Sequence, residues 1–213
     1  MFLSLLANQY PLTALFMKTI SPKEIILSII LLLSIGLFAQ NKKVTWRNII
    51  QSQDESWFAS EEAKNIADNV LLYQRDFGGW PKNVEMQNLL SADEKVKLLQ
   101  SKSDPVGCTI DNGATCQEML FLSKIYKAQP KEDYKNAFLR GLMYLISSQY
   151  SNGGFPQFFP LKKGYYTHIT YNDDAMVNVL KILKELKDRS NYYSITPPEE
   201  IMPMVENAFN KGI

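Results

Sequence analysis

A nine-residue stretch that occurs twice in this chain limits its fold more than any other feature. The first copy, residues 74–82, reads QRDFGGWPK, and the second, residues 149–157, reads QYSNGGFPQ, with Gly153 following Gly78 by 75 residues. Each copy comes directly after a stretch with the apolar spacing of an amphipathic helix. Helical hairpins that cannot bury their apolar stripes alone pack as a solenoid or close as an α/α toroid. The sequence therefore predicts repeated hairpins with matching loops at one end.

Apolar residues recur with a helical period through most of the chain. Ser60 is placed to cap one helix, and Ser91 with Glu94 has the spacing of a capping box. Between Phe155 and Tyr171, aromatic and β-branched residues predict a small β-hairpin insertion. We expect an all-α fold, with helices from residue 60 to the first Gly-Gly pair, over about 91–102, 112–129 and 134–151, from about 173, and from 199 to the C-terminus.

The N-terminus has the pattern of an export signal. Lys18 and Lys23 precede an apolar run of 14 residues, 25–38, which Ala39 follows. The run is short for the roughly 20 residues that span a bilayer. We expect a signal peptide over 1–39, with residues 1–16 open to interpretation as a mis-assigned start. Membrane contact is then expected only before cleavage, and the protein is expected to be secreted or periplasmic. Residues 40–59 form an N-terminal segment, and 60–213 form the helical domain.

The charge balance excludes partners that are recruited by a global field. The 23 basic and 22 acidic residues leave a net charge of +1, so we expect no nucleic-acid partner. An acidic ligand would have to be bound by a local site. Cys108 and Cys116 could form a disulfide in an oxidising compartment or remain two buried thiols, and the sequence leaves both open.

The repeated loops hold an aromatic ring in a defined place. Two glycines permit close backbone approach and a proline stiffens the exit, which fixes Trp80 in the first copy and Phe155 in the second. A flat ring at a cleft mouth can stack on the apolar face of a sugar. The rings could equally be core plugs that close each hairpin. Lys82, beside Trp80, favours an anionic ligand.

Acidic clusters precede two of the predicted helices. Asp111 with Asn112 comes before one helix, and Asp173 with Asp174 comes before another. They could be helix caps, but their recurrence on equivalent hairpins predicts that they face one cleft. Converging oxygens suit Ca²⁺, or a general acid and base pair. His168, the only histidine, is open to either a ligand contact or a structural role.

Four of these segments together resemble the family 10 pectate lyases. They are ADNVLLYQRDFGGWPKN at 67–83, TIDNGAT at 109–115, QYSNGGFPQFFPLKKGYYTHITYNDDAM at 149–176 and AFNKGI at 208–213. The resemblance covers about residue 61 to the C-terminus. It implies an (α/α)3 toroid, here incomplete, that cleaves polygalacturonate by β-elimination to unsaturated oligogalacturonides. It also implies Ca²⁺ as the cofactor, bridging protein and substrate carboxylate.

The resemblance also implies roles for single residues. Asp111 and Asp173 match the acidic Ca²⁺ and subsite residues of that family. The positions that fall in its motif segments as substrate contacts are Trp80, Lys82, Asp111, Asn112, Phe155 and His168. Phe155 stands where tryptophan is common in the family, which keeps a stacking face but loses the indole N–H.

The catalytic base of that family is an arginine in a later part of the domain. The four arginines of this chain match no such motif, so we expect the base beyond Ile213 and expect the isolated chain, as a monomer, to be inactive or very weak. Two alternatives from the residues remain open. One is a non-catalytic exported fragment that binds polygalacturonate. The other is an α/α-toroid glycoside hydrolase that uses Asp111 and Asp173 as acid and base.

Overall fold

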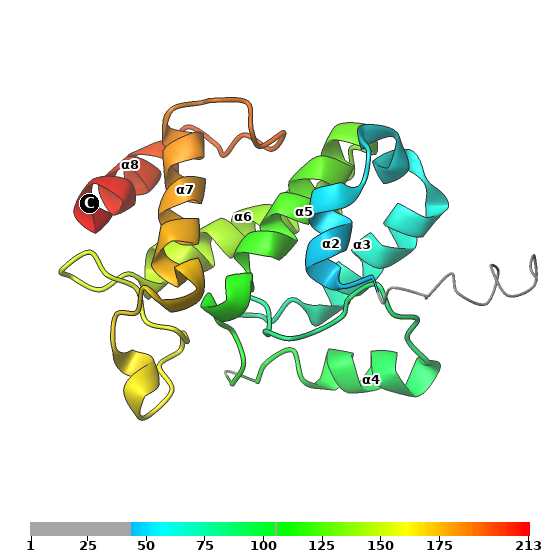
Figure 1. Ribbon diagram of the computed structural model, residues 1–213, viewed down its shortest axis with the longest axis horizontal. Helices are drawn as coiled ribbons and strands as arrows, with labels where there is room; N and C mark the ends of the chain where they lie inside the picture. The colour runs from blue at the N-terminus through cyan, green and yellow to red at the C-terminus, as the bar shows by residue number, and fades with distance from the viewer. Residues whose placement is uncertain (1–43, 105) are drawn as a thin grey trace, which may run out of the picture. The chain divides into compact units, whose positions relative to one another are not determined.

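The computed structural model describes residues 44–104 and 106–213, and the predicted signal peptide lies outside these residues. No helix within the described residues is both long enough and apolar enough to cross a bilayer. The elements in chain order (Figure 1) are α2 (Trp46–Ser52), η1 (Glu55–Ala59), α3 (Glu61–Tyr73), α4 (Ala92–Gln100), η2 (Asp111–Gly113), α5 (Cys116–Ala128), α6 (Glu132–Ser148), η3 (Tyr165–Thr167), η4 (Asn172–Asp174), α7 (Ala175–Lys187) and α8 (Met202–Gly212), where η denotes a 3-10 turn.

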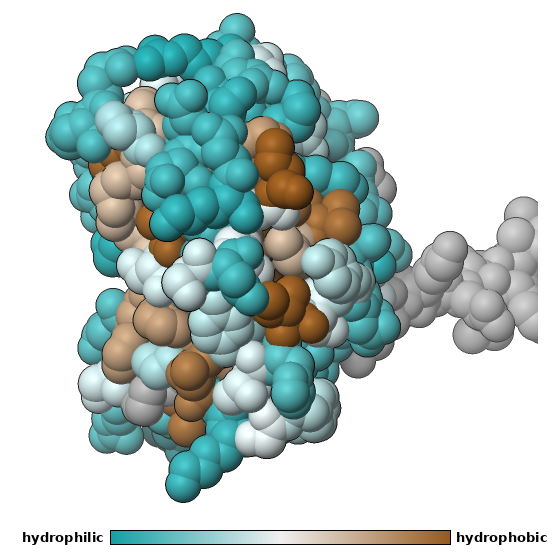
Figure 2. Space-filling model, turned by 90° about the vertical axis from the view of Figure 1, so that its left-hand side faces the viewer, coloured by the Kyte–Doolittle hydropathy of each residue, from teal (hydrophilic) through white to brown (hydrophobic). Residues whose placement is uncertain are grey.

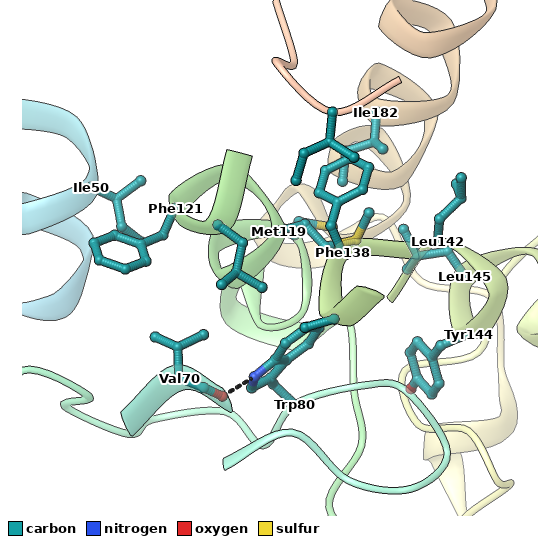
Figure 3. Close-up of a cluster of buried hydrophobic side chains, with 14 of the residues drawn as sticks. Ile50, Val70, Trp80, Met119, Phe121, Phe138, Leu142, Tyr144, Leu145 and Ile182 are labelled. Atoms are coloured by element: carbon teal, nitrogen blue, oxygen red, sulfur yellow. Dashed lines mark hydrogen bonds between the residues drawn. The ribbon is translucent and has the colours of Figure 1, made fainter. Parts of the chain in front are cut away.

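The helices form neighbouring hairpins around one apolar core. α5 packs on α6, α7 packs on α8, and α3 contacts both α5 and α6. Figure 3 shows part of the core, where Met119 of α5 lies near Phe138 and Leu142 of α6, while Phe121 of α5 lies beside Ile50 of α2. These five side chains are fully buried, because the apolar stripe of each helix faces its neighbour. The predicted all-α class is confirmed.

The N-terminal segment predicted over 40–59 packs into the same core where it is described. α2 and η1 both contact α5. The rings of Trp46 and Phe121 have centroids 4.9 Å apart, and Phe58 lies 5.8 Å from the same Phe121 ring. Residues 44–213 therefore make one compact unit.

The helix starts follow the predicted capping chemistry. The Ser60 hydroxyl accepts a hydrogen bond from the backbone N–H of Ala63 at 3.1 Å. Ser91 and Glu94 form the predicted capping box, with both reciprocal bonds present. α4 ends at Gln100, two residues earlier than expected, and none of its side chains is buried.

The first repeated loop is fastened to the next hairpin by one glutamine amide. Gln74 Nε2 donates to the carbonyls of Gly78 and of Ala137 in α6, both at 2.8 Å. Gly78 has φ +95°, and a Cβ there would lie 2.4 Å from the carbonyl oxygen of Arg140. Only glycine permits this backbone angle and this approach to α6.

The second loop repeats the same arrangement one hairpin later. Gln149 Nε2 donates to the carbonyls of Gly153 at 2.9 Å and of Ala208 in α8 at 2.8 Å. Gly153 has φ +89°, and a Cβ there would lie 1.7 Å from the carbonyl oxygen of Lys211. The sequence repeat is thus a structural repeat, in which each loop is fastened to the second helix of the following pair.

The β-hairpin predicted over 155–171 is not formed. The main-chain hydrogen bonds of Gln157 do not form a regular ladder within this segment. Its N–H donates to the carbonyl of Tyr166, while its carbonyl accepts from the N–H of Ile110 at 3.0 Å. Pro156 has no N–H to give to a ladder. The described part of this segment holds only single β-bridges, Thr109 with Phe158 and Pro156 with Ile169, and the turn η3.

Both cysteines are free thiols and both are buried. The structure therefore shows the buried-thiol alternative for Cys108 and Cys116, not the disulfide. Burial raises the pKa of the Cys108 thiol to about 11, and burial also raises the pKa of Cys116.

Candidate functional site

Two matching turns, η2 before α5 and η4 before α7, contact each other where the two helices begin (Figure 1). Each turn holds residues in the left-handed backbone region: Asn112 has φ +53°, Asp173 has φ +51° and Asp174 has φ +56°. Asn and Asp tolerate this region better than other non-glycine residues, but it still costs energy. Such conformations persist where the surrounding structure fixes them, and they cluster at functional sites.

The two turns open onto a shared hollow of about 340 Å³. Its lining consists of Asn112 from η2, Asp173 and Asp174 from η4, and Arg47 from α2. Asn112 and the two aspartates thus share one cavity, as the recurrence of the acidic clusters predicted, but Asp111, expected there as a Ca²⁺ ligand, does not line it. Sequence reasoning missed Arg47 because it lies far from the motif segments in sequence and reaches the hollow only through the packing of α2 on α5.

Asp111 precedes Asn112 in η2 and is not the cap of α5. Its side chain is 8% exposed and forms an ion pair with Lys82. Its Oδ1 accepts a hydrogen bond from the backbone N–H of the next residue, Asn112, at 3.1 Å. α5 begins only at Cys116, so Asp111 is outside capping range.

Asp173 and Asp174 are also free of capping roles. Asp173 is exposed and its Oδ2 accepts from the amide of Asn172 at 2.7 Å. Asp174 occupies the N-cap position of α7 but makes no side-chain capping bond there. The helix-cap interpretation of the acidic clusters is therefore wrong, and the carboxylates of η4 remain open to a ligand.

A buried hydrogen-bond network ties Asp111 to the first repeated loop. Thr115 Oγ1 accepts from the N–H of Trp80 at 3.1 Å and donates to the carbonyl of Thr109 at 2.8 Å. Thr109 Oγ1 in turn accepts from the N–H of Asp111 at 3.0 Å. Since Lys82 follows Trp80 by two residues, this network places the two partners of the ion pair.

The predicted sugar-stacking role of Trp80 and Phe155 is wrong. Both side chains are 0% exposed, so the core-plug alternative is the arrangement found. Trp80 Nε1 donates to the carbonyl of Val70 at 2.8 Å (Figure 3). The ring fits against α6 because Gly141 lacks a side chain, and a Cβ there would lie 3.0 Å from Cζ3 of Trp80. The Trp80 ring is thus packed in the core against a helix of the next hairpin.

His168 is exposed and does not line the hollow. Its backbone N–H donates to the carbonyl of Tyr165 at 3.0 Å, which closes the turn η3. The ring surface beside Lys82 comes instead from Phe158, whose centroid lies 5.7 Å from Lys82 Nζ. Phe158 lies in the segment 149–176 that carries the family resemblance. It is in a loop, however, and no periodic pattern there predicted in which direction its ring points.

A second, smaller hollow of about 140 Å³ adjoins the same residues. Lys82, Asn112 and Arg47 contribute to its lining, and so does Glu118 of α5. Glu118 is buried, and its Oε1 accepts from Nε1 of Trp46 at 2.7 Å, while its Oε2 has no hydrogen-bond partner among the described residues. Burial raises the pKa of Glu118 to about 7. No sequence pattern separated this glutamate from a surface residue of α5.

The site provides the right kind of oxygen for Ca²⁺ but only part of a coordination sphere. Among the described residues, no three His, Cys, Asp or Glu side chains are grouped closely enough to hold a metal ion. Asn112, Asp173 and Asp174 supply hard oxygen donors in one hollow. Ca²⁺ takes six to eight oxygens, so carboxylates of a bound ligand and water would have to complete the set.

Comparison with known proteins identifies the family. The family model described as pectic acid lyase matches residues 74–213. Two similar solved structures are a family 10 polysaccharide lyase from Cellvibrio cellulosa and an aspartate-to-alanine mutant of a family 10 polysaccharide lyase from the same organism in complex with trigalacturonic acid. Both are 30% identical to this chain, with a TM-score of 0.58.

These alignments cover 78% of this chain and 47% of the mutant or 46% of the other structure, so the chain spans about half the length of these relatives. No curated protein matches. The likeness confirms the fold that the family resemblance implied, the helical hairpins of an (α/α)3 toroid, and so decides between the solenoid and the toroid that the repeat left open. The chain therefore belongs to the pectic acid lyase family.

Proposed function

We propose that this chain binds polygalacturonate and takes part in its Ca²⁺-assisted β-elimination to unsaturated oligogalacturonides. The observation that carries the proposal is the hollow between η2 and η4, where oxygen donors and one guanidinium lie together. An anionic sugar with a bound cation needs both kinds of group. The family membership and the complex of the Cellvibrio mutant with trigalacturonic acid support this assignment.

The reaction is limited by charge. A base removes the proton on C5 of a galacturonate, the bond between C4 and its glycosidic oxygen breaks, a C4=C5 double bond forms and the leaving oxygen takes up a proton. Negative charge develops beside a carboxylate that is already anionic. A bound Ca²⁺ would supply positive charge to that carboxylate, and we propose Asn112, Asp173 and Asp174 as its protein ligands.

The cationic residues of the site would orient the substrate. Arg47 is exposed in the hollow, and a planar guanidinium can bind a carboxylate through two parallel hydrogen bonds. Lys82 is held by Asp111, so its ammonium is fixed beside the site and is only partly buried. In this proposal Asp111 acts mainly by positioning Lys82. The arginine base implied by the family resemblance stays a prediction.

The predicted setting of the protein is part of the same proposal. The order of charged, apolar and small residues in 1–39 supports export to the periplasm or the medium. An exported protein could reach polygalacturonate there. We also propose that the protein acts as a monomer.

Titration calorimetry with trigalacturonate, with Ca²⁺ and with a chelator, tests this function. We expect Ca²⁺-dependent binding that Asp173→Asn weakens at least about tenfold, the loss of one charge-assisted contact. Asp93→Asn, at an exposed carboxylate on α4, should leave the affinity unchanged. Binding that ignores Ca²⁺ and Asp173 would refute the assignment.

Product analysis separates the possible chemistries. Ultraviolet absorbance of the C4=C5 double bond would show elimination, whereas saturated reducing ends would show a hydrolase. Binding without product would indicate that the base is not among these residues.

A further inference from the structure

An aromatic and basic cluster lies next to the candidate site in the segment where a β-hairpin was expected. We call Phe158, Lys162, Tyr165 and Tyr166 the tyrosine cluster. The rings of Tyr165 and Tyr166 have centroids 4.0 Å apart with an interplanar angle of 34°. Phe158 meets Tyr166 nearly edge-on, with centroids 5.2 Å apart at 82°. The three rings thus make one continuous aromatic surface.

Two ammonium groups lie over these rings. Lys162 Nζ is 4.2 Å from the centroid of Tyr166 and 4.9 Å from that of Phe158. Lys82 Nζ lies 5.7 Å from the same Phe158 ring and connects the cluster to Asp111. The neighbouring hydroxyl of Tyr165, followed by the charge of Lys162, lowers the pKa of Tyr166. Lys162 and Lys82 thus bring positive charge to the aromatic surface.

The outer part of the tyrosine cluster is exposed although its backbone is fixed. Tyr165 is 65% exposed, whereas Phe158 is buried. The carbonyl of Tyr166 accepts from the N–H of Gln157 at 3.1 Å, and the carbonyl of Thr167 accepts from the hydroxyl of Tyr150 at 2.6 Å. The N–H groups of Thr167 and His168 close the turn η3 by donating to the carbonyls of Gly164 and Tyr165. An exposed ring on a fixed backbone costs little conformational entropy when it binds a ligand.

The cluster also offers a cation to a ligand. Lys162 is exposed, and no ion pair in the described part of the chain involves it. The rings of Tyr166 and Phe158 lie on one side of its ammonium, so an anionic group can approach from the solvent side. Figure 2 shows one face of the molecule, where hydrophobic patches lie among hydrophilic side chains.

We propose that the tyrosine cluster is a second uronate-binding subsite, where Tyr165 stacks on the apolar face of a sugar ring and Lys162 binds its carboxylate. This inference rests on the proposed function, because Lys82 links the cluster to the hollow between η2 and η4. A polymer of acidic sugars presents an apolar ring face and a carboxylate in every unit. The cluster matches both features, and it provides the exposed ring that the buried Trp80 and Phe155 do not.

Calorimetry with oligogalacturonates long enough to reach both places tests the subsite. Tyr165→Ala should weaken binding about tenfold, as expected for the loss of one stacked ring, while Tyr165→Phe should retain the affinity. Lys162→Met should weaken binding of the acidic oligosaccharide by a similar factor. Lys163→Met, at the adjacent exposed lysine, is the matched control for the loss of one positive charge.

The outcomes distinguish this inference from the proposed function. If the wild-type protein binds no oligogalacturonate at all, both fail. If the wild type binds with Ca²⁺ and both Tyr165→Ala and Lys162→Met bind as tightly as Lys163→Met, the second subsite is wrong and the proposed function stands. Circular dichroism melting of each variant checks the fold, and unchanged melting is expected because Lys162 and Tyr165 are exposed.

Discussion

Replacing Glu118 by glutamine tests how much a buried acid beside the candidate site lowers the free energy of unfolding. The carboxyl is buried in α5 and accepts one hydrogen bond from Nε1 of Trp46. Its second oxygen has no hydrogen-bond partner among the described residues, so the ionised form is poorly compensated. Glutamine has nearly the same shape as the protonated acid and carries no charge.

The size of the effect follows from the pKa. Burial raises the pKa of Glu118 to about 7 from an ordinary value of 4.5. At about 1.4 kcal/mol for each pKa unit, ionisation in the folded state costs about 3 kcal/mol. Below the unfolded pKa the acid is protonated in both states and this cost is absent. Stability then falls as pH rises through the folded pKa, and the full cost applies above it.

Urea unfolding over a range of pH measures this difference. Near pH 4 the wild type and Glu118→Gln should have similar free energies of unfolding, and near pH 8 the variant should be more stable by up to about 3 kcal/mol. Glu206→Gln, at an exposed position on α8, should follow the wild-type pH dependence. The reasoning is refuted if Glu118→Gln and the wild type lose stability in parallel across this range.

Two further predictions concern packing and thiols. Gly153→Ala should cost about 3 kcal/mol or more, because a Cβ would lie 1.7 Å from the carbonyl oxygen of Lys211 in addition to the strain of φ +89°. Gly164→Ala, at φ +99° with its nearest neighbour 4.0 Å away, isolates the strain, and equal losses in urea unfolding would contradict the packing argument. Cys108 and Cys116 should resist an aromatic disulfide reagent until the protein unfolds, because burial raises both pKa values. A melting temperature that falls on addition of reductant would instead indicate a bridge between them.

Local features of the fold were predictable from the sequence because their causes are local. The apolar period sets each helix, and the capping box of Ser91 and Glu94 requires residues only three apart. The repeat predicted that η2 and η4 would lie together, since equivalent ends of packed hairpins lie on the same side. The placement of Asn112 and Asp173 in one hollow was therefore predictable from the repeat, and their role stays a prediction.

The errors arose where a distant element decides the outcome. Whether Trp80 is a sugar platform or a core plug depends on Gly141 of α6, which leaves space for the ring. Likewise, the expected β-hairpin does not form, because the carbonyl of Gln157 accepts from the N–H of Ile110, which is distant in sequence. Arg47 entered the site through the packing of α2, and no pattern near it in the sequence indicated a ligand contact.

The glutamine amides of the repeated loops have a consequence for how such a protein can vary. The side-chain N–H groups of Gln74 and Gln149 donate only to main-chain carbonyls, and Gln74 Oε1 also accepts from the Arg140 guanidinium. The stagger between one hairpin and the next therefore does not depend on which aromatic side chains the loops carry. The first loop can therefore carry tryptophan and the second phenylalanine while the stagger between the hairpins stays the same. Residues that face a ligand can then be exchanged one at a time on helices whose spacing stays constant.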